Sequence, residues 1–449
     1  MSTLPAQRLA PHAGPAADRP WTHVGQAAAA LAAGMGVGRF VYTPILPLMH
    51  AHAGLSASAG AHLATANYVG YLLGALAGIL APALVRSSAL LRAALLVLTV
   101  DLALMPATRS ATVWLALRLI AGAASALVFV IAVSSLLGWL REHPAHLSGW
   151  AFGGVGAGIA LSGLLVLALR SVGDWRTAWW ASAGLAALLT AGAWRLRTGP
   201  AAASPVGRGG GSTRGGGSGT LPVRSGPPAP AVAPAAGAST VLSPTAVGRP
   251  ARVPAPAGRA AVQRPHRWFA ALFVSYTLEG VGYIVAGTFL VAAIDQSSPG
   301  WVGGGAWVLV GLAAVPSSAL WAWLGHRWSR PGLLLAALVV QAAGIALPAL
   351  VSGVAPALVS AVLFGATFIG ISTLALAAGA HLGFPRSVAL LTAGYSAGQI
   401  LGPLAVTPLL HHGYHQALLL AAGVVLLAAA AAAVLRVGFP RHMVVVRPA

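Results

Sequence analysis

Long apolar runs, interrupted by Pro, Gly, His or Arg, dominate this sequence. A helix that crosses a membrane needs about 20 mainly apolar residues. Twelve runs reach that length, which predicts an all-α protein with twelve membrane-spanning helices. The predicted spans are residues 23–48, 57–84, 88–107, 110–139, 146–170, 175–196, 267–294, 301–325, 331–351, 354–382, 386–411 and 414–437.

The apolar pattern stops between the sixth and seventh spans, over residues 198–265. This stretch contains "GRGGGSTRGGGSGT" and "PPAPAVAPAAGAS". A segment without apolar periodicity cannot bury a core and is typical of a disordered linker. The predicted organisation is an N-terminal tail at 1–22, a six-helix bundle at 23–196, a linker at 197–266, a second six-helix bundle at 267–437 and a C-terminal tail at 438–449.

Composition places the chain among integral membrane proteins. It is 57% hydrophobic and 7% charged, with a mean hydropathy of +0.81, whereas soluble domains carry about 25% charged residues. The net charge of +20 comes from arginines that stand singly between apolar runs or in the linker, so we expect no nucleic-acid partner. The absence of Cys excludes disulfides and thiol nucleophiles.

Several function classes lack the residues they need. A chain without Lys has no Gly-x-x-x-x-Gly-Lys phosphate loop, which argues against an ATP-driven pump. Neither a His-Glu-x-x-His helix nor a Ser/His elbow is present. We therefore expect no enzyme, no catalytic residue and no cofactor.

The arginines predict the orientation of the chain, because cytoplasmic loops carry an excess of basic residues. With the N-terminus inside, the outer side receives three arginines, Arg109, Arg170 and Arg176, and the inner side receives the other loop and tail arginines. Both tails and the linker are thus predicted to be cytoplasmic, in a multi-pass protein of the bacterial inner membrane.

The two halves repeat each other. "GVGRFVYTPIL" in the first span parallels "GVGYIVAGTFL" in the seventh at an offset of 244, and Gly122 parallels Gly365 at an offset of 243. "GAGIALSG" in the fifth span parallels "SAGQILGP" in the eleventh at an offset of 240. Six spans per half bring both halves into the membrane from the same side. Such parallel repeats, related by an axis along the membrane normal, are the major facilitator arrangement.

Specific segments carry a closer resemblance. "GMGVGRFVYTPILPLM" and "LATANYVGYLLGALAG" in the first half, with "FGATFIGISTLAL" and "LTAGYSAGQILGPL" in the second, resemble the YbfB/YjiJ-like group of the major facilitator superfamily (MFS). The resemblance covers both bundles and implies the twelve-helix MFS fold and a transporter driven by the proton-motive force. It implies no substrate.

The cytoplasmic loops depart from the superfamily pattern, which pairs an Asp with arginines. "GILAPALVRSSALLR" keeps Arg86 and Arg92 without an Asp, and "LGHRWSR" puts His326 where the Asp is expected. The cytoplasmic charge latch that the resemblance implies is therefore weakened or absent.

Four ionisable residues lie inside predicted spans: Arg39, Asp101, Arg118 and Glu279, with Asp295 at a mouth. A charge at the centre of a helix costs about 2.5–3.5 kcal/mol on insertion scales. Two arginines and two carboxylates can pair one to one, which predicts two ion pairs.

The first predicted pair joins Asp101 to Arg118 on consecutive antiparallel spans. Their distances from the span ends place both about 10 Å below the outer surface. One interpretation is a structural bridge between the third and fourth helices, since the third helix is a support helix in the MFS fold. The other follows from "RLIAGAASA", which resembles the superfamily's fourth-helix Arg-x-x-x-x-Gly pattern shifted by one residue. That resemblance implies proton handling by Asp101 and Arg118.

The second predicted pair joins Arg39 to Glu279. The repeat aligns Arg39 with Tyr283, so Glu279 lies one turn deeper on a helix that faces the first across the cavity of the fold. Three alternatives are open: the two residues bind substrate or proton directly, they form a structural bridge between the helices, or they make no contact. Protonated Glu279 would free Arg39 for a carboxylate or phosphate in symport, whereas a cationic substrate would displace the proton in antiport. The sequence favours neither.

Further polar residues on the cavity helices are candidates for hydrogen bonds with a substrate, or for bonds between helices: Asn67, Tyr68, Tyr71, Tyr276, Tyr283, Tyr395 and Gln399. Six outer histidines include His50 and His411, but no carboxylate accompanies them and we expect no metal site. The expected partners are the lipid bilayer, protons and a small solute, and the expected state is a monomer. A non-transporting sensor or scaffold on the same fold is the alternative.

Overall fold

The computed structural model describes residues 20–81, 83–139, 146–171, 173–198, 266–298 and 300–439. The described residues of the first half form helices at every predicted span. The first span comprises α1 (Pro20–Leu31), η1 (Ala32–Val37) and α2 (Tyr42–Ala53). The others are α3 (Ala57–Leu80), α4 (Ser88–Leu104) with η3 (Met105–Ala107), α5 (Ala111–Trp139), α6 (His146–Leu169) and α7 (Trp175–Ala193).

The second half repeats this order. Its helices are α8 (His266–Ser297), α9 (Trp301–Leu324), α10 (Arg330–Leu350), α11 (Val354–His381), α12 (Ser387–Val406) continued by η5 (Thr407–His412), and α13 (Tyr414–Leu435). The fold prediction of an all-α protein with twelve spans in two bundles is confirmed. The predicted tails and linker lie outside the described residues, apart from a few residues beside α1, α7, α8 and α13.

Ten of the described helical segments are long and apolar enough to cross a membrane. The helices of the predicted second and sixth spans, α3 and α7, are not among these ten. Three polar side chains of α3, Asn67, Tyr68 and Tyr71, are all buried in the protein. A span that turns polar groups inward need not be apolar all round.

Polar caps mark where several helices begin. Ser56 accepts a hydrogen bond from the Ala59 amide and Ser87 accepts one from Leu90, at 3.2 and 3.1 Å. On the loop before α7, the Thr177 amide donates to Asp174 and lowers the pKa of that carboxyl. Side-chain caps satisfy amides that have no partner in the first turn.

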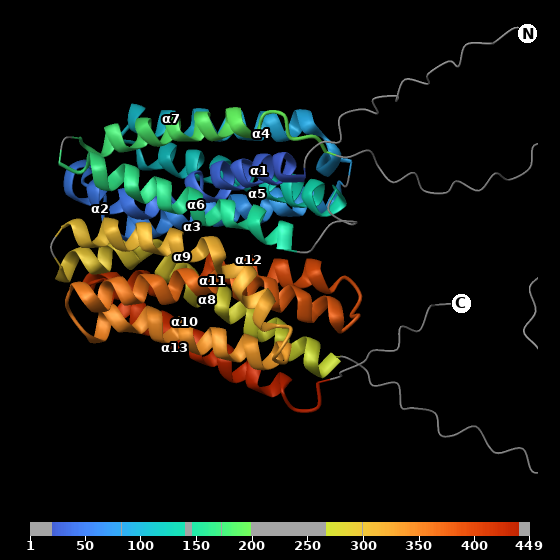
Figure 1. The fold of residues 1–449 in the computed structure, drawn as a ribbon. Helices are drawn as coiled ribbons and strands as arrows, with labels where there is room; N and C mark the ends of the chain where they lie inside the picture. Colours follow the sequence, from blue (N-terminus) through green and yellow to red (C-terminus); the bar gives the residue numbers. More distant parts are fainter. Residues whose placement is uncertain are drawn as a thin grey trace, which may run out of the picture. The chain divides into compact units, whose positions relative to one another are not determined.

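Two groups of six spans lie side by side (Figure 1). The first comprises α1 to α7, in which α1 and α2 together form one span, and the second comprises α8 to α13. They meet where α6 packs against α9 and where α3 packs against α12. These two interfaces are related by the repeat, since α3 corresponds to α9 and α6 to α12. Within each group, a hydrogen bond ties the residues that follow the last helix to another helix of the same group. The Ser135 hydroxyl, near the end of α5, donates to the Arg197 carbonyl after α7. The Trp268 indole, near the start of α8, donates to the Val437 carbonyl after α13.

Close glycine contacts confirm the repeat in three dimensions. A Cβ on Gly122 would strike the Asn67 carbonyl, and a Cβ on Gly365 would strike the Val310 carbonyl. Asn67 and Val310 are themselves 243 positions apart, the offset that relates the two glycines. The crossings of α3 with α5 and of α9 with α11 therefore use the same contact, which only a residue without a side chain permits.

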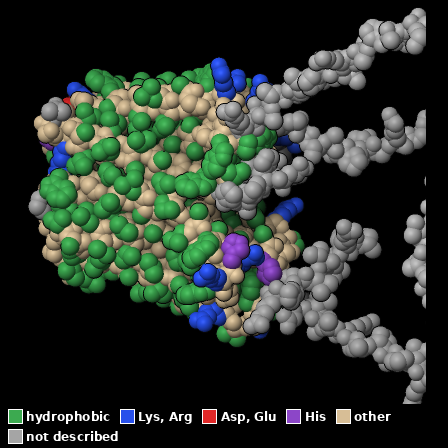
Figure 2. All heavy atoms as spheres, viewed as in Figure 1, with side chains coloured by type: hydrophobic (Ala, Val, Ile, Leu, Met, Phe, Trp, Pro, Cys, Tyr) green, Lys and Arg blue, Asp and Glu red, His purple; other side chains and the backbone are tan. Residues whose placement is uncertain are grey.

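The visible face of the molecule carries a broad apolar belt. In Figure 2, basic side chains gather at the two ends of the helices, and hydrophobic side chains cover the middle. Leu188, Leu312 and Leu427 are among the exposed apolar residues. The helical bundle thus matches a hydrocarbon layer bounded by two polar surfaces.

Candidate functional site

The first span is broken where it carries Arg39. Residues 38–41 form turns between η1 and α2, and η1 is a π-helix. The Gly38 and Phe40 amides bond five residues back, to Ala33 and Met35, at 2.9 and 3.3 Å. Pro44 follows, and it has no amide to donate. Such π segments are frequent at functional sites, and this one directs Arg39 toward the other half of the protein.

Arg39 is 3% exposed and is held between the halves. Its Nη2 donates to Gln399 Oε1 of α12. Its guanidinium lies 4.2 Å from the ring centroid of Tyr71 and 5.1 Å from that of Tyr68, both on α3. Nε has no hydrogen-bond partner. A permanent cation is therefore held by an amide oxygen and aromatic faces, with a free donor.

Arg118 supports the break in the first span. Its Nη1 and Nη2 donate to the Gly38 and Arg39 carbonyls, at 3.4 and 3.3 Å. Because the Thr43 amide bonds to Phe40, it leaves the Arg39 carbonyl without its usual helical donor. Arg118 replaces that donor and positions the segment that carries Arg39.

The predicted ion pair between Asp101 and Arg118 is not formed. Both carboxylate oxygens of Asp101 are buried without a hydrogen-bond partner among the described residues, whereas Arg118 turns to the backbone of the first span. Among the described residues, one arginine–carboxylate contact falls within 4.0 Å, and it joins Arg170 to Asp295. Equal depth in the membrane did not fix the direction of either side chain around its helix axis.

The predicted ion pair between Arg39 and Glu279 is also not formed. Glu279 is fully buried on α8 and accepts a hydrogen bond from Gln341 Nε2 of α10 at 3.3 Å. Arg39 bonds to Gln399 instead. Gln341 is not among the residues predicted from the sequence. The signal that could have found it is that it is the one side-chain amide in the apolar run "GLLLAALVVQAAGIALPAL".

The other candidates divide into two groups. Gln399 and Tyr283 adjoin Arg39: Gln399 Nε2 donates to the Tyr283 hydroxyl at 3.3 Å. Asn67 lies apart from this group, because its amide donates to the Arg118 carbonyl at 2.9 Å and joins α3 to α5. The structure thus brings together Arg39, Tyr71, Gln399 and Tyr283, and gives Asn67 a contact between helices.

An aromatic cluster continues from Tyr283 into the second half. The Tyr283 ring stacks on Tyr395 at a centroid distance of 5.3 Å and on Phe368 at 6.1 Å, with interplanar angles of 12° and 9°. Tyr395 stacks on Tyr276 at 4.3 Å. From the first half, Phe40 contacts Phe368 edge-on. Flat apolar surfaces therefore surround the buried cation on the side of α8, α11 and α12.

Polar contacts also join the two halves beyond Arg39 along the first span. Thr43 donates to the Gly287 carbonyl, and these residues are 244 positions apart, so equivalent points of the repeat touch each other. The other contacts join Tyr68 to Thr288 at 2.8 Å and His50 to Tyr414 at 2.7 Å.

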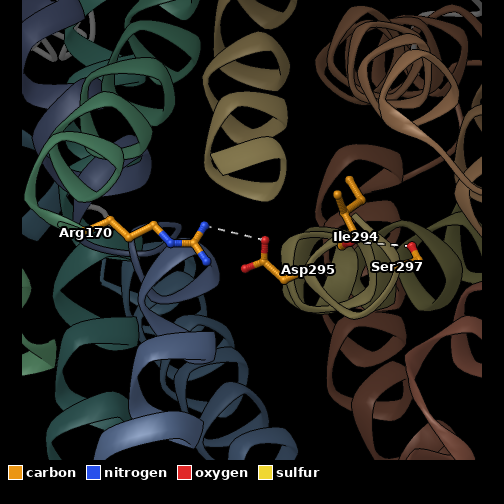
Figure 3. A network of polar contacts seen from close by, with 4 residues as sticks. All are labelled: Arg170, Ile294, Asp295 and Ser297. Atoms are coloured by element: carbon orange, nitrogen blue, oxygen red, sulfur yellow. Dashed lines mark hydrogen bonds and ion pairs between the residues drawn. The ribbon is translucent and has the colours of Figure 1, made fainter. Parts of the chain in front are cut away.

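A further contact between the halves is the ion pair of Arg170, just after the end of α6, with Asp295 on α8 (Figure 3). Nη1 and Oδ1 are 3.8 Å apart. The pair borders a small cavity of about 190 Å³ that is also lined by Pro47, Leu48 and Val291. Asp295 lies near the end of α8, beside this cavity.

The chain is similar to one described protein family and to solved structures. The family described as "Uncharacterised MFS-type transporter YbfB" matches residues 31–208 and 231–433. A search of curated proteins finds no match. A similar solved structure is a crystal structure of the nucleoside transporter NupG with one aspartate-to-alanine mutation, at 12% identity and a TM-score of 0.62. The match covers 93% of this chain and 99% of that chain, and at this identity it shows the fold.

Proposed function

Because this chain belongs to the YbfB family of major facilitator transporters, we propose that it carries a small organic anion across the bacterial inner membrane by alternating access. The family is one of transporters and not of enzymes. We further propose that a proton moves with the anion and that both termini are cytoplasmic.

The observation that carries the proposal is the charge at the centre. Arg39 is buried at the junction of the halves, and the described structure gives it no carboxylate partner. A buried cation without a counterion is costly. The carboxylate or phosphate of a solute would supply that counterion. Its oxygen would replace Gln399 Oε1 as the acceptor of the hydrogen bond from Arg39. This favours symport of an anion over antiport of a cation.

Alternating access requires the outer contacts to break. The Arg170–Asp295 pair and the His50–Tyr414 bond join the halves on the outer side and hold this conformation. When they separate, the outer path can open while the cytoplasmic side closes. Exchange between two such conformations is how a major facilitator moves a solute past a fixed site.

The outer ion pair gives a direct test of this motion. Asp295→Asn should increase labelling of Val291→Cys by an impermeant maleimide up to about fivefold, because a partly exposed ion pair contributes about 0.2–1 kcal/mol. Arg170 and Asp295 side chains are 38% and 17% exposed. The introduced cysteine is the one thiol that the maleimide can label, because the chain has no cysteine of its own.

Asp174→Asn is the matched control for Asp295→Asn. It removes a carboxylate from the same side, but Asp174 bonds to Thr177 within its own half. Labelling should stay at the starting rate in this variant. An equal rise in both variants, or none in Asp295→Asn, would contradict a role of the Arg170–Asp295 pair in outer opening.

A further inference from the structure

Among the described residues, no cation is bonded to Glu279, and its one hydrogen bond comes from the neutral amide of Gln341. The titratable groups that interact with it are Tyr276 and Tyr283 of α8 and Tyr395 of α12. Arg39, the cation of the central site, bonds to Gln399. An ionised carboxylate would therefore be buried with one long amide contact, an arrangement that proteins avoid because of its desolvation cost.

The other polar atom of each side chain in this contact is unsatisfied within the described structure. Glu279 Oε2 and Gln341 Oε1 are both buried, and neither has a hydrogen-bond partner in the part of the chain that the structure describes. Both are acceptors when the carboxyl is ionised, so neither can satisfy the other. A protonated carboxyl has one O–H donor and one carbonyl acceptor, and a primary amide offers the matching acceptor and donor. One proton on Oε2 would satisfy both atoms at once.

We infer that Glu279 carries a proton in this outward-closed conformation and shares it with Gln341 in an acid–amide pair. The amide Nε2 donates to Oε1, and the acid O–H donates to the amide Oε1. In the cycle proposed above, this proton is the one that travels with the anion, and only that assignment rests on the proposed function. Gln341 is a positioning residue, because it holds the proton in place without contact to the solute.

The repeat shows that the fold does not need polar residues here. Met35 stands 244 positions before Glu279, and Leu98 stands 243 positions before Gln341. In the first half, Leu98 packs directly against Gly38, one turn from Met35. The equivalent crossing is therefore built from apolar side chains of similar size. The second half has a carboxyl and an amide at the two positions where the first half packs with Met and Leu.

Infrared spectroscopy of the full chain in nanodiscs tests this inference without substrate or transport. The chain has two glutamates, Glu142 and Glu279, so carboxyl-¹³C glutamate labels two sites. We expect a protonated-carboxyl carbonyl band at neutral pH that moves to lower wavenumber with the label. It should persist in Glu142→Gln and vanish in Glu279→Gln. In Gln341→Leu it should shift to higher wavenumber, because the hydrogen bonds are lost.

The first half supplies the control for folding. The double variant Glu279→Met with Gln341→Leu copies the first-half pair, and it should fold with wild-type thermal stability or better and show no band. The inference is overturned if the wild-type protein shows no label-sensitive acid band at neutral pH, or if Gln341→Leu leaves its position unchanged. A band that behaves as expected in a protein that moves no protons would sustain the acid–amide pair and refute the coupling role.

Discussion

Arg39→Gln is expected to weaken binding of organic anions about 10- to 150-fold. Hydrogen bonds to a charged group contribute about 1.5–3 kcal/mol, and each 1.4 kcal/mol is a factor of ten in affinity. In the proposed site, the arginine is the group that meets the anion. The measurement is a thermal-shift titration with a panel of small carboxylates and organic phosphates, comparing the half-saturating concentration of each stabilising anion.

Two further variants sharpen this comparison. Arg39→Lys keeps the charge but cannot present the planar fork of a guanidinium, so it should fall between wild type and Arg39→Gln. Arg92→Gln removes a peripheral arginine, whose Nε donates to the Trp194 carbonyl, and should bind as wild type does. If Arg39→Gln and Arg92→Gln titrate alike, Arg39 does not hold the anion.

Gly122→Ala and Gly365→Ala should each destabilise the protein by about 1–3 kcal/mol, the usual cost of forcing atoms into a packed core. In both, the new Cβ meets a backbone carbonyl of a neighbouring helix, which cannot move aside as a flexible side chain can. Because the two positions are equivalent in the repeat, we expect similar losses. Denaturant or thermal unfolding in micelles measures them.

Gly423→Ala is the matched control for the glycine variants. Gly423 also lies inside a helix, α13, but a Cβ there meets nothing within 4 Å. Alanine is a better helix former than glycine by about 0.8–1.0 kcal/mol, so this variant should be neutral or more stable. Equal stability of all three variants would show that the two helix crossings are looser than described.

Much of the architecture could be predicted from the sequence because the membrane imposes simple lengths. Each predicted span begins and ends within several residues of its helices, as α11 (Val354–His381) does for the run 354–382. The pairing of Gly122 with Gly365 also followed from the repeat, since identical offsets place glycines at identical crossings. Depth along the membrane normal can be counted in residues.

Side-chain partners could not be predicted in the same way. Arg39 and Glu279 were placed at reachable depths, but direction around a helix axis depends on local geometry. The π segment and the turns at residues 38–41 direct the Arg39 side chain to Gln399. The packing of α8 on α10 brings Gln341 within hydrogen-bond distance of Glu279. Arg118 turned to backbone carbonyls that exist as free acceptors because that helix breaks. None of these features has a signal in apolar run length.

Uptake into proteoliposomes under an imposed pH gradient tests the central claim most directly. The solutes are the anions that stabilise the wild-type protein in the thermal-shift panel. We expect uptake that is accelerated by an acidic outside, abolished by a protonophore and lost in Arg39→Gln. Proton-coupled transport of an anion bound by Arg39 is contradicted if no such anion enters wild-type vesicles faster than protein-free ones, or if Arg39→Gln transports at the wild-type rate.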